Sequence, residues 1–433
     1  MLLSLTDQEL NFLQQINDSG SAKDAQRAQI IMLAGSCSTY EEIAKAASST
    51  LRQVQYWLRA WEKRGVSIFP DSAPETILAS VASVTSMDSV AAAPAVEEVP
   101  VDLDLVETAE PPAPRLPLQL AETVGVLPDD PMAEAGRKVL LFHFERMLLN
   151  EHGSRTGADI EAVHDMRVAT RRMRSAFRLF RPYYERKIAN RYIDQLRRTG
   201  TTLGAVRDLE VLIDKARRYA DAHPDHDLTP LLENWQRDLD KKRGHLIKRL
   251  DSSKFDKFVR KFHAFLTTPG SGALPQPDPG TAYQVRHAAP RILYALYERV
   301  RSYETALGDM PIETMHALRI EFKHLRYALE FFAEVLGPEG KQVIKEVKGM
   351  QDLLGDLNDA EVAHLKLRTY LDRYNEKYSG TPSFMRPNVE GLFHYLLYLD
   401  SEKLRLLQAF PAAWEKFQSG DIRRSLALSV AVL

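Results

Sequence analysis

The sequence has 433 residues but only one cysteine, Cys37, and no apolar run of the length that a bilayer span requires. A single cysteine excludes an intrachain disulfide and a zinc site built from several thiolates. The first ten residues, MLLSLTDQEL, lack a basic segment ahead of the apolar ones, a pattern that predicts no signal peptide. We therefore expect a cytoplasmic protein that does not enter the membrane.

Net charge is also nearly absent, but the total conceals an uneven distribution. The chain carries 57 Lys and Arg against 59 Asp and Glu, which gives a formal charge of −2. Residues 71–130 contain twelve acidic residues and one basic residue, whereas residues 1–70 contain seven of each sign. Residues 131–433 therefore carry a net charge of +9. Because the positive charge is concentrated there, the small total does not exclude a polyanionic partner.

The acidic segment 71–130 lacks aromatic side chains altogether and contains eight of the 23 prolines. A segment of this composition has too little apolar surface to form a core, so we expect an extended linker. The sequence thus predicts a small helical module in residues 1–70, an acidic linker in 71–130 and a larger helical domain in 131–425.

Strand signals are scarce as well. The sequence contains no convincing alternation of apolar and polar residues and no Asn-Gly or Asp-Gly hairpin turn. Helical periodicity runs instead through residues 131–433, with one break at 267–280. We therefore predict an all-α fold whose larger domain divides into two halves.

The two halves resemble each other. EAVHDMRVATRRMRSAFRLF (161–180) aligns with ETMHALRIEFKHLRYALEFF (313–332) at an offset of 152, and LGAVRDLEV (203–211) aligns with LGDLNDAEV (354–362) at an offset of 151. Two separated blocks in the same order indicate an internal repeat. We expect two similar helical bundles that pack as a pseudo-twofold pair.

Basic residues recur on one face of each repeated helix, at spacings of three and four residues. The first stripe consists of His164, Arg167, Arg171, Arg174, Arg178 and Arg181. The second stripe consists of His316, Arg319, Lys323 and Arg326, and it is interrupted by Glu330. The opposite face of the first helix should pack against the core through Val163, Met166, Ala169, Thr170, Met173, Ala176, Phe177 and Phe180. Neighbouring arginines repel one another, so this arrangement favours a polyanionic ligand.

If the two halves face each other, both stripes would line one groove, and guanidinium groups could bind phosphate oxygens bidentately. Four more basic residues precede the LG blocks and could complete the lining: Arg197, Arg198, Lys345 and Lys348. Two other interpretations stay open. The stripes could pair with acidic residues of neighbouring helices, or they could bind a membrane surface.

The motifs VHDMRVATRRMRSAFRLF, MHALRIEFKHLRYALEFF and MQDLLGDLNDAEVA resemble the CHAD family (conserved histidine α-helical domain) over about residues 131–425. The resemblance implies two four-helix bundles with internal symmetry, which bind inorganic polyphosphate in a basic central channel and associate with polyphosphate granules. It assigns the channel lining to His164, Arg167, Arg171, Arg174, His316, Arg319, Lys323 and Arg326. The sequence departs from the family at Asn358, where histidine is frequent.

Signals of catalysis are missing. The sequence contains neither a GxxxxGK phosphate loop nor a GxSxG elbow, and it lacks the Glu-x-Glu-x-Lys strand of the triphosphate-tunnel domains often fused to CHAD domains. His164 and His316 without a carboxylate cluster are a weak metal signal. We expect a binding protein with no catalytic residues, metal or cofactor. The alternatives are a DNA-binding regulator and a metal-dependent hydrolase of phosphate polymers.

The N-terminal module resembles a transposase-like helix-turn-helix in residues 39–65. Thr39 with Glu42, and Thr50 with Gln53, are spaced as capping boxes. The buried faces should come from Ile43, Ala44, Val54, Trp57, Leu58 and Trp61, and the candidate DNA-reading residues are Arg52, Gln55, Tyr56 and Arg59. The module has no net charge, whereas DNA affinity rests on excess positive charge. DNA binding and binding of a protein partner both remain open.

Overall fold

The computed structural model describes residues 116–157, 160–275, 282–306 and 311–433 of the larger domain. In the N-terminal region it describes residues 3, 5–19, 22–35, 39–47, 49, 54, 57, 58 and 61. The chain divides into two compact units, residues 1–105 and 106–433. Each unit is described by itself below.

The N-terminal unit contains the helices α1 (Asp7–Ser19), α2 (Ala22–Ala34) and α3 (Tyr40–Ala46). The capping box predicted at α3 is confirmed, because the Glu42 amide donates to Thr39 Oγ1 at 3.3 Å and the Thr39 amide donates to the Glu42 carboxylate at 3.2 Å. Five of the six residues expected in the core are buried, namely Ile43, Ala44, Val54, Leu58 and Trp61, and Trp57 packs against them. The four candidate DNA-reading residues, Arg52, Gln55, Tyr56 and Arg59, lie outside the described residues, so the DNA interpretation stays a prediction.

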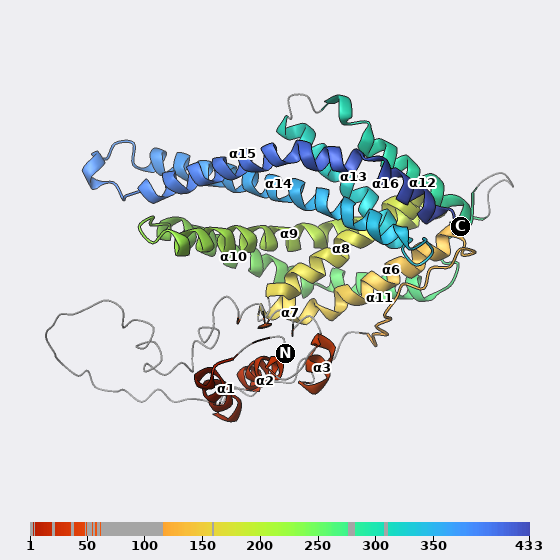
Figure 1. The fold of residues 1–433 in the computed structure, drawn as a ribbon, viewed down its shortest axis with the longest axis horizontal. Helices are drawn as coiled ribbons and strands as arrows, with labels where there is room; N and C mark the ends of the chain where they lie inside the picture. Colours follow the sequence, from red (N-terminus) through yellow and green to blue (C-terminus); the bar gives the residue numbers. More distant parts are fainter. Residues whose placement is uncertain are drawn as a thin grey trace. The chain divides into compact units, whose positions relative to one another are not determined.

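The larger unit is helical, as predicted, and no strand occurs in the parts of it that the structure describes (Figure 1). Its first half consists of α6 (Met132–Leu149), α7 (Glu151–Thr156), α8 (Ile160–Phe180), α9 (Arg186–Ala222), α10 (Thr229–Leu250) and α11 (Ser253–Thr267). Its second half consists of α12 (Val285–Arg301), α13 (Ile312–Phe331), α14 (Glu339–Lys377), α15 (Glu390–Gln418) and α16 (Gly420–Val430).

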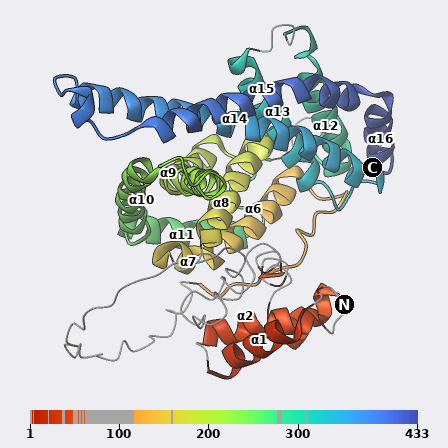
Figure 2. The same ribbon diagram turned by 60° about the vertical axis from the view of Figure 1, so that its left-hand side comes forward.

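The halves follow the same plan, which confirms the predicted pair of bundles. In the first half α8 packs on α6 and α9, and α9 packs on α10; in the second half α13 packs on α12 and α14, and α14 packs on α15. The pairs α9–α10 and α14–α15 form long hairpins (Figure 1). Figure 2, in which α9 is seen nearly end-on while α15 runs across the view, shows that the hairpins are inclined to each other. The helices α8 and α13 pack together and join the halves.

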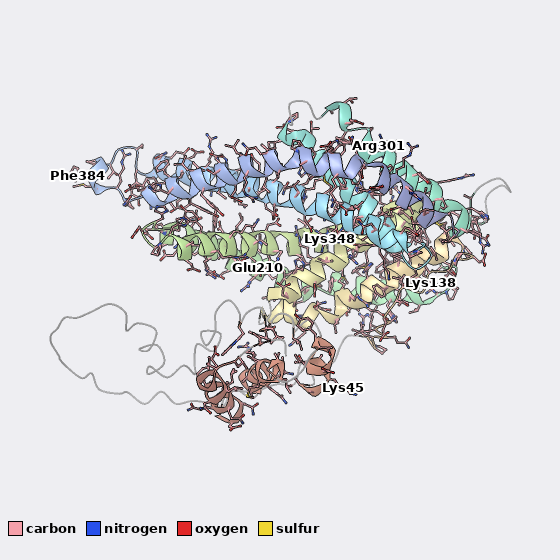
Figure 3. The ribbon with its side chains drawn as sticks, in the orientation of Figure 1. Lys45, Lys138, Glu210, Arg301, Lys348 and Phe384 are labelled. Carbon is pink, nitrogen blue, oxygen red and sulfur yellow. The ribbon has the colours of Figure 1, made fainter. Side chains whose placement is uncertain are left out.

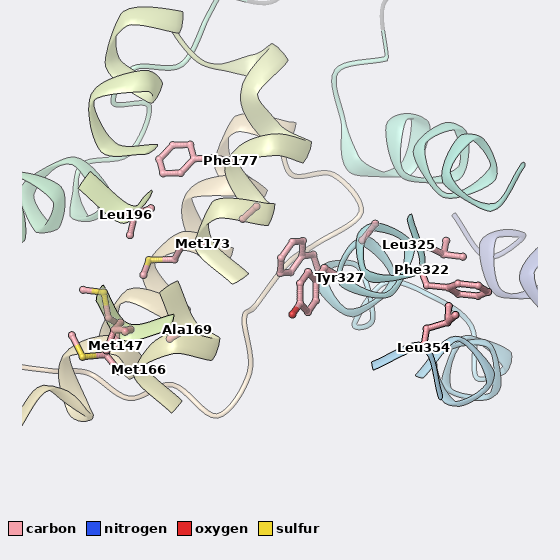
Figure 4. Packing of buried hydrophobic residues seen from close by; sticks show 14 of the residues in the cluster. Met147, Met166, Ala169, Met173, Phe177, Leu196, Phe322, Leu325, Tyr327 and Leu354 are labelled. Carbon is pink, nitrogen blue, oxygen red and sulfur yellow. The ribbon is translucent and has the colours of Figure 1, made fainter. Parts of the chain in front are cut away.

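The residues expected to pack behind the first stripe are all buried. Met166, Met173 and Phe177 have no exposed surface, and they lie together in the core (Figure 4). Even the polar member, Thr170, is fully buried, because its hydroxyl donates to the Met166 carbonyl at 2.8 Å within the helix. Burial of this apolar face fixes the rotation of α8 about its axis and turns the first stripe away from the core.

Residues 116–130 belong to the larger domain, although the composition of 71–130 predicted that they are part of the linker. Leu116, Leu118 and Val124 pack against its core, and Val126 is buried. The Glu334 carboxylate accepts hydrogen bonds from the amides of three consecutive residues, Val124, Gly125 and Val126, at 2.6, 2.7 and 2.9 Å. We call residues 116–130 the strap. Composition averaged over 71–130 concealed its few apolar anchors, and the rest of the predicted linker, 71–115, lies outside the described residues.

Candidate polyanion-binding site

The first stripe lies on α8 except for its last member. Arg181 falls one residue beyond α8, at the start of the short 3-10 helix η2 (Arg181–Tyr183), so the prediction that it continues the helix face is wrong. The cause is Pro182, which disfavours the α conformation in the residue before it. The members of the second stripe all lie on α13, within Ile312–Phe331.

Two contacts fix how α8 and α13 cross. Arg178 Nη1 donates to His324 Nε2 at 2.8 Å, and Arg172 Nη2 lies 2.8 Å from Glu330 Oε2. With the repeat offset of 152, His324 corresponds to Arg172 and Glu330 corresponds to Arg178. Both contacts therefore join the same two positions of the repeat. In one contact the first position comes from α8 and the second from α13, and in the other contact the helices are exchanged. This is the contact pattern that a pseudo-twofold axis between α8 and α13 requires.

The crossing brings cations of both stripes together around Lys323. Burial, followed in order of size by the charges of Arg319, Arg171, Arg178 and Arg174, lowers the pKa of the Lys323 ammonium group to about 8. Three of these arginines lie on α8, whereas Lys323 and Arg319 lie on α13. The two predicted stripes thus form one continuous concentration of positive charge.

A third helix adds to this cluster. Burial lowers the pKa of the Arg174 guanidinium group, and the charges of Arg197 and Arg178 contribute to the shift. Arg197 lies on α9, so its predicted place beside the stripes is supported. Arg198 lies near Arg249 instead, because its charge contributes to the lowered pKa of that group. Lys345 and Lys348 are exposed on α14, and neither is among the groups that shift the pKa of Lys323. Figure 3 labels Lys348.

The repeated LG blocks have a visible role beside the arginines. A Cβ atom added at Gly204 would lie 3.6 Å from Arg167 Nε, and one added at Gly355 would lie 4.0 Å from Arg319 Nε. These glycines correspond to each other in the repeat, as do the two arginines. In both halves, glycine therefore leaves one side of the guanidinium group uncovered by the adjacent helix.

Several guanidinium groups in the cluster have unused donors. The Nε atoms of Arg171, Arg319 and Arg326 are buried, and none has a hydrogen-bond partner among the described residues. A buried donor without an acceptor costs roughly 1–3 kcal/mol, but Arg207, Arg243, Arg249, Arg286 and Arg301 have the same feature outside the cluster, so it does not by itself mark a ligand site. Within the described residues, no carboxylate forms an ion pair with Arg171, Arg174, Arg319 or Lys323.

Carboxylates do occupy the margins of the cluster, as one of the open interpretations anticipated. Arg167 Nη2 lies 2.9 Å from Asp208, and Arg326 Nη1 lies 3.5 Å from Glu330. Asp359, which corresponds to Asp208 in the repeat, lies 3.5 Å from Lys215 of the opposite half. Pairing with acidic residues therefore explains the ends of the stripes but leaves the cations at the crossing unneutralised.

The departure from the family pattern at Asn358 has a structural role. His316 Nδ1 lies 2.9 Å from Asn358 Oδ1, so an amide holds the imidazole that begins the second stripe. With Oδ1 as the acceptor, His316 carries its proton on Nδ1 and keeps Nε2 for another partner.

No sequence pattern predicted the roles of Arg172, His324 and Tyr327. Tyr327 is buried between the halves (Figure 4), with the guanidinium groups of Arg171, Arg172 and Arg326 at 5.2–5.8 Å from its ring centre. The sequence contains a run of arginines in the first half and a tyrosine, Tyr327, in the second. Their contact could not be predicted, because it depends on how α8 and α13 cross.

Two kinds of feature are absent from the described residues. No group of three or more His, Cys, Asp or Glu side chains in these parts of the chain could hold a metal ion. No helix among them combines the length and the apolar character of a membrane span.

Comparisons with known proteins identify a family and a fold that this chain resembles. A family model, the CHAD domain, matches residues 138–368. Two curated relatives, both uncharacterized proteins from strains of Mycobacterium tuberculosis, are 30% identical in an alignment of 263 residues; the match covers 56% of this chain and 47% of theirs. The chain thus spans about half the length of the curated relatives it matches.

Two solved structures resemble the larger unit. The crystal structure of the CHAD domain from the plant Ricinus communis has a TM-score of 0.53 and 25% identity, and the match covers 69% of this chain and 96% of that one. PptA from Streptomyces chartreusis has a TM-score of 0.51 and 15% identity, and the match covers 66% of this chain and all of PptA. The second likeness supports the fold alone.

Proposed function

Because this chain belongs to the CHAD family, whose model covers more than half of it, we propose that its larger domain binds inorganic polyphosphate along the two basic stripes. The observation that carries the proposal is the cluster of Lys323 with four arginines from two helices of opposite halves. A linear chain of phosphates presents negative charge at every unit, and such a cluster offers both point charges and bidentate donors to it.

Binding in this proposal follows from electrostatics and from hydrogen bonds that the guanidinium groups donate. Arg171 and Arg319, each on one of the two stripes, would donate to phosphate oxygens. Each cation that neutralises a phosphate also releases a counterion from the polymer, so affinity should fall steeply as salt rises. The protein in this proposal is a binding protein and not an enzyme, and it acts in the cytoplasm at polyphosphate granules.

The test is a binding titration with purified full-length protein, polyphosphate and duplex DNA at matched salt. We expect polyphosphate to bind and to displace DNA, and DNA not to displace polyphosphate. The variant Arg171→Glu with Lys323→Glu places one reversed charge in each half and should lose far more affinity than either single change. Equal affinity for both polymers, or full affinity in the double variant, would contradict the proposal.

A matched control keeps this test specific. Arg368→Glu with Arg373→Glu makes the same change in net charge on exposed residues of α14 that belong to neither stripe. The control should retain most of the affinity. Incubation with divalent cations tests the hydrolase alternative separately, because only that alternative predicts shortening of the polyphosphate chain.

A further inference from the structure

A second basic surface lies on α11, outside the stripes. This helix buries Phe255, Phe258, Phe262 and Phe265 on one side. Its other side exposes three lysines at spacings of three and four residues, Lys254, Lys257 and Lys261. These lysines therefore form one row along the helix, about 10 Å long at a rise of 1.5 Å per residue.

The carboxylates near this row are already engaged elsewhere. Asp256 forms an ion pair with Arg260, and Asp251 at the α10–α11 turn forms one with Arg155. Within the described residues, no carboxylate forms an ion pair with any of the three lysines. The row thus keeps its full positive charge, and its members repel one another in the free protein.

Contacts with α9 connect this row to the stripes. The Tyr192 hydroxyl donates to the Lys261 carbonyl at 3.2 Å, which fixes α11 alongside α9. At the other end of α11, Arg249 donates to Gln195 Oε1 at 2.9 Å and to Thr199 Oγ1 at 3.3 Å. The α10–α11 turn is therefore held beside the part of α9 that carries Arg197 and Arg198.

These two neighbouring arginines face different partners. The charge of Arg197 acts on Arg174 in the first stripe, whereas the charge of Arg198 acts on Arg249 next to α11. Arg191, about two turns earlier on α9, is exposed, and its charge acts on Tyr192 at the α11 contact. Positive charge consequently continues around α9 from the stripes to α11.

We propose that the outer basic surface, formed by Arg191, Arg198, Lys254, Lys257 and Lys261, is a second subsite that binds the continuation of long polyphosphate chains. The inference rests on the proposed function, because the stripes are the first subsite. Short chains fill the stripes alone, whereas long chains also reach around α9 to α11. The surface thereby gives the protein a preference for long polymers.

The experiment compares two probes, tripolyphosphate and long-chain polyphosphate, with the full-length chain. The variant Lys254→Glu/Lys257→Glu/Lys261→Glu should lose roughly tenfold or more in affinity for the long chain and little for tripolyphosphate. Its slope of log affinity against log salt should become shallower by about 2–3 for the long chain, since each lost phosphate contact removes about 0.7–0.9. All three positions are exposed, and an acidic residue in the first turn of α11 suits the helix dipole, so the fold should persist.

Controls separate the two proposals. The triple variant Arg368→Glu/Arg373→Glu/Lys377→Glu carries the same charge change on α14 and should retain long-chain affinity, and Lys→Gln at the three α11 positions should give a smaller loss in the same direction. Unchanged long-chain affinity in the α11 variant, or equal losses for both probes, would overturn the second subsite alone. Failure of the unsubstituted protein to bind either probe would instead overturn the proposed function.

Discussion

Arg172 of α8 contacts Glu330 of α13 at 2.8 Å, and the residues that correspond to them in the other half, His324 and Arg178, also lie 2.8 Å apart. The same two positions of the repeat therefore meet twice between the halves, once as Arg172 with Glu330 and once as His324 with Arg178. His324 Nε2 accepts from Arg178, so the ring carries a proton on Nδ1, which lies 3.5 Å from Glu321. Burial and the charge of Arg178 lower the pKa of His324, in keeping with a neutral ring.

The variant Glu330→Gln should raise polyphosphate affinity and lower stability. Glu330 engages both Arg172 and Arg326, and a neutral side chain would release both guanidinium groups toward a ligand. The loss of a partly buried ion pair should cost about 1–3 kcal/mol of unfolding free energy. Urea denaturation and a polyphosphate titration measure the two effects. Unchanged affinity would show that Glu330 does not compete with the ligand.

The affinity for polyphosphate should fall as the pH rises through about 8. Lys323, whose pKa lies at about 8 in the free protein, is partly neutral there, and bound phosphates favour its charged form. Binding should therefore take up protons between pH 7.5 and 9, which calorimetry in buffers of different ionisation enthalpy detects. Lys323→Arg stays charged throughout and should bind without this proton uptake. An equal uptake in that variant would assign the effect to another group.

Lys323 also affects stability, and here the dependence on pH is opposite: its contribution to stability increases as pH rises. The folded pKa of Lys323 is depressed below the unfolded value of about 10.4, so the unfolded chain binds more protons between pH 8 and 10. The contribution of Lys323 to stability therefore rises with pH between pH 8 and 10. Below pH 8 the folded protein bears the full cost of keeping the buried ammonium group charged. Lys323→Met should abolish this contribution, which denaturant titrations at pH 7.5 and 9.5 can measure against the unsubstituted protein.

Helix periodicity predicted which residues share a face of α8 and of α13, because the direction of a side chain on a helix follows from its residue number. Arg171 and Arg174 were placed correctly for this reason. The same periodicity failed at Arg181, which lies beyond the end of α8. Periodicity could not predict the contact of Arg172 with Glu330, since Arg172 is outside the three–four row and the pairing depends on how two distant helices cross. The strap escaped detection for a similar reason, because Glu334, which binds its amides, lies about 210 residues away.

Replacement of Gly204, a glycine of the first LG block, by alanine should raise stability and weaken polyphosphate binding. Alanine favours the helical conformation, so unfolding free energy should rise by about 0.5–1 kcal/mol. The new methyl group would contact Arg167 Nε, which restricts the guanidinium group and should weaken polyphosphate binding modestly. Gly244→Ala on α10 is the matched control, because its Cβ would meet no atom within 4 Å and no stripe residue is near. A variant that is stabilised and binds normally would contradict a role for Gly204 in the site.

The strap provides the last prediction, Glu334→Ala. This change leaves the amides of Val124, Gly125 and Val126 without their shared carboxylate acceptor, and Gly125 adopts a positive φ of 75° to present its amide. Because Glu334 is exposed and water can replace it in part, we expect a loss of about 1–2 kcal/mol in unfolding free energy.

Two observations would identify the strap as the cause of that loss. The amides of residues 124–126 should exchange hydrogen faster in the variant. The amides at the centre of α8 should exchange at an unchanged rate, because Lys138 and Arg146 of α6 also hold the strap and the effect stays local. Asp372→Ala on the exposed side of α14 is the control for loss of one carboxylate. Normal exchange of the strap amides in Glu334→Ala would mean that apolar anchors such as Val126, and not the carboxylate, hold the strap in place.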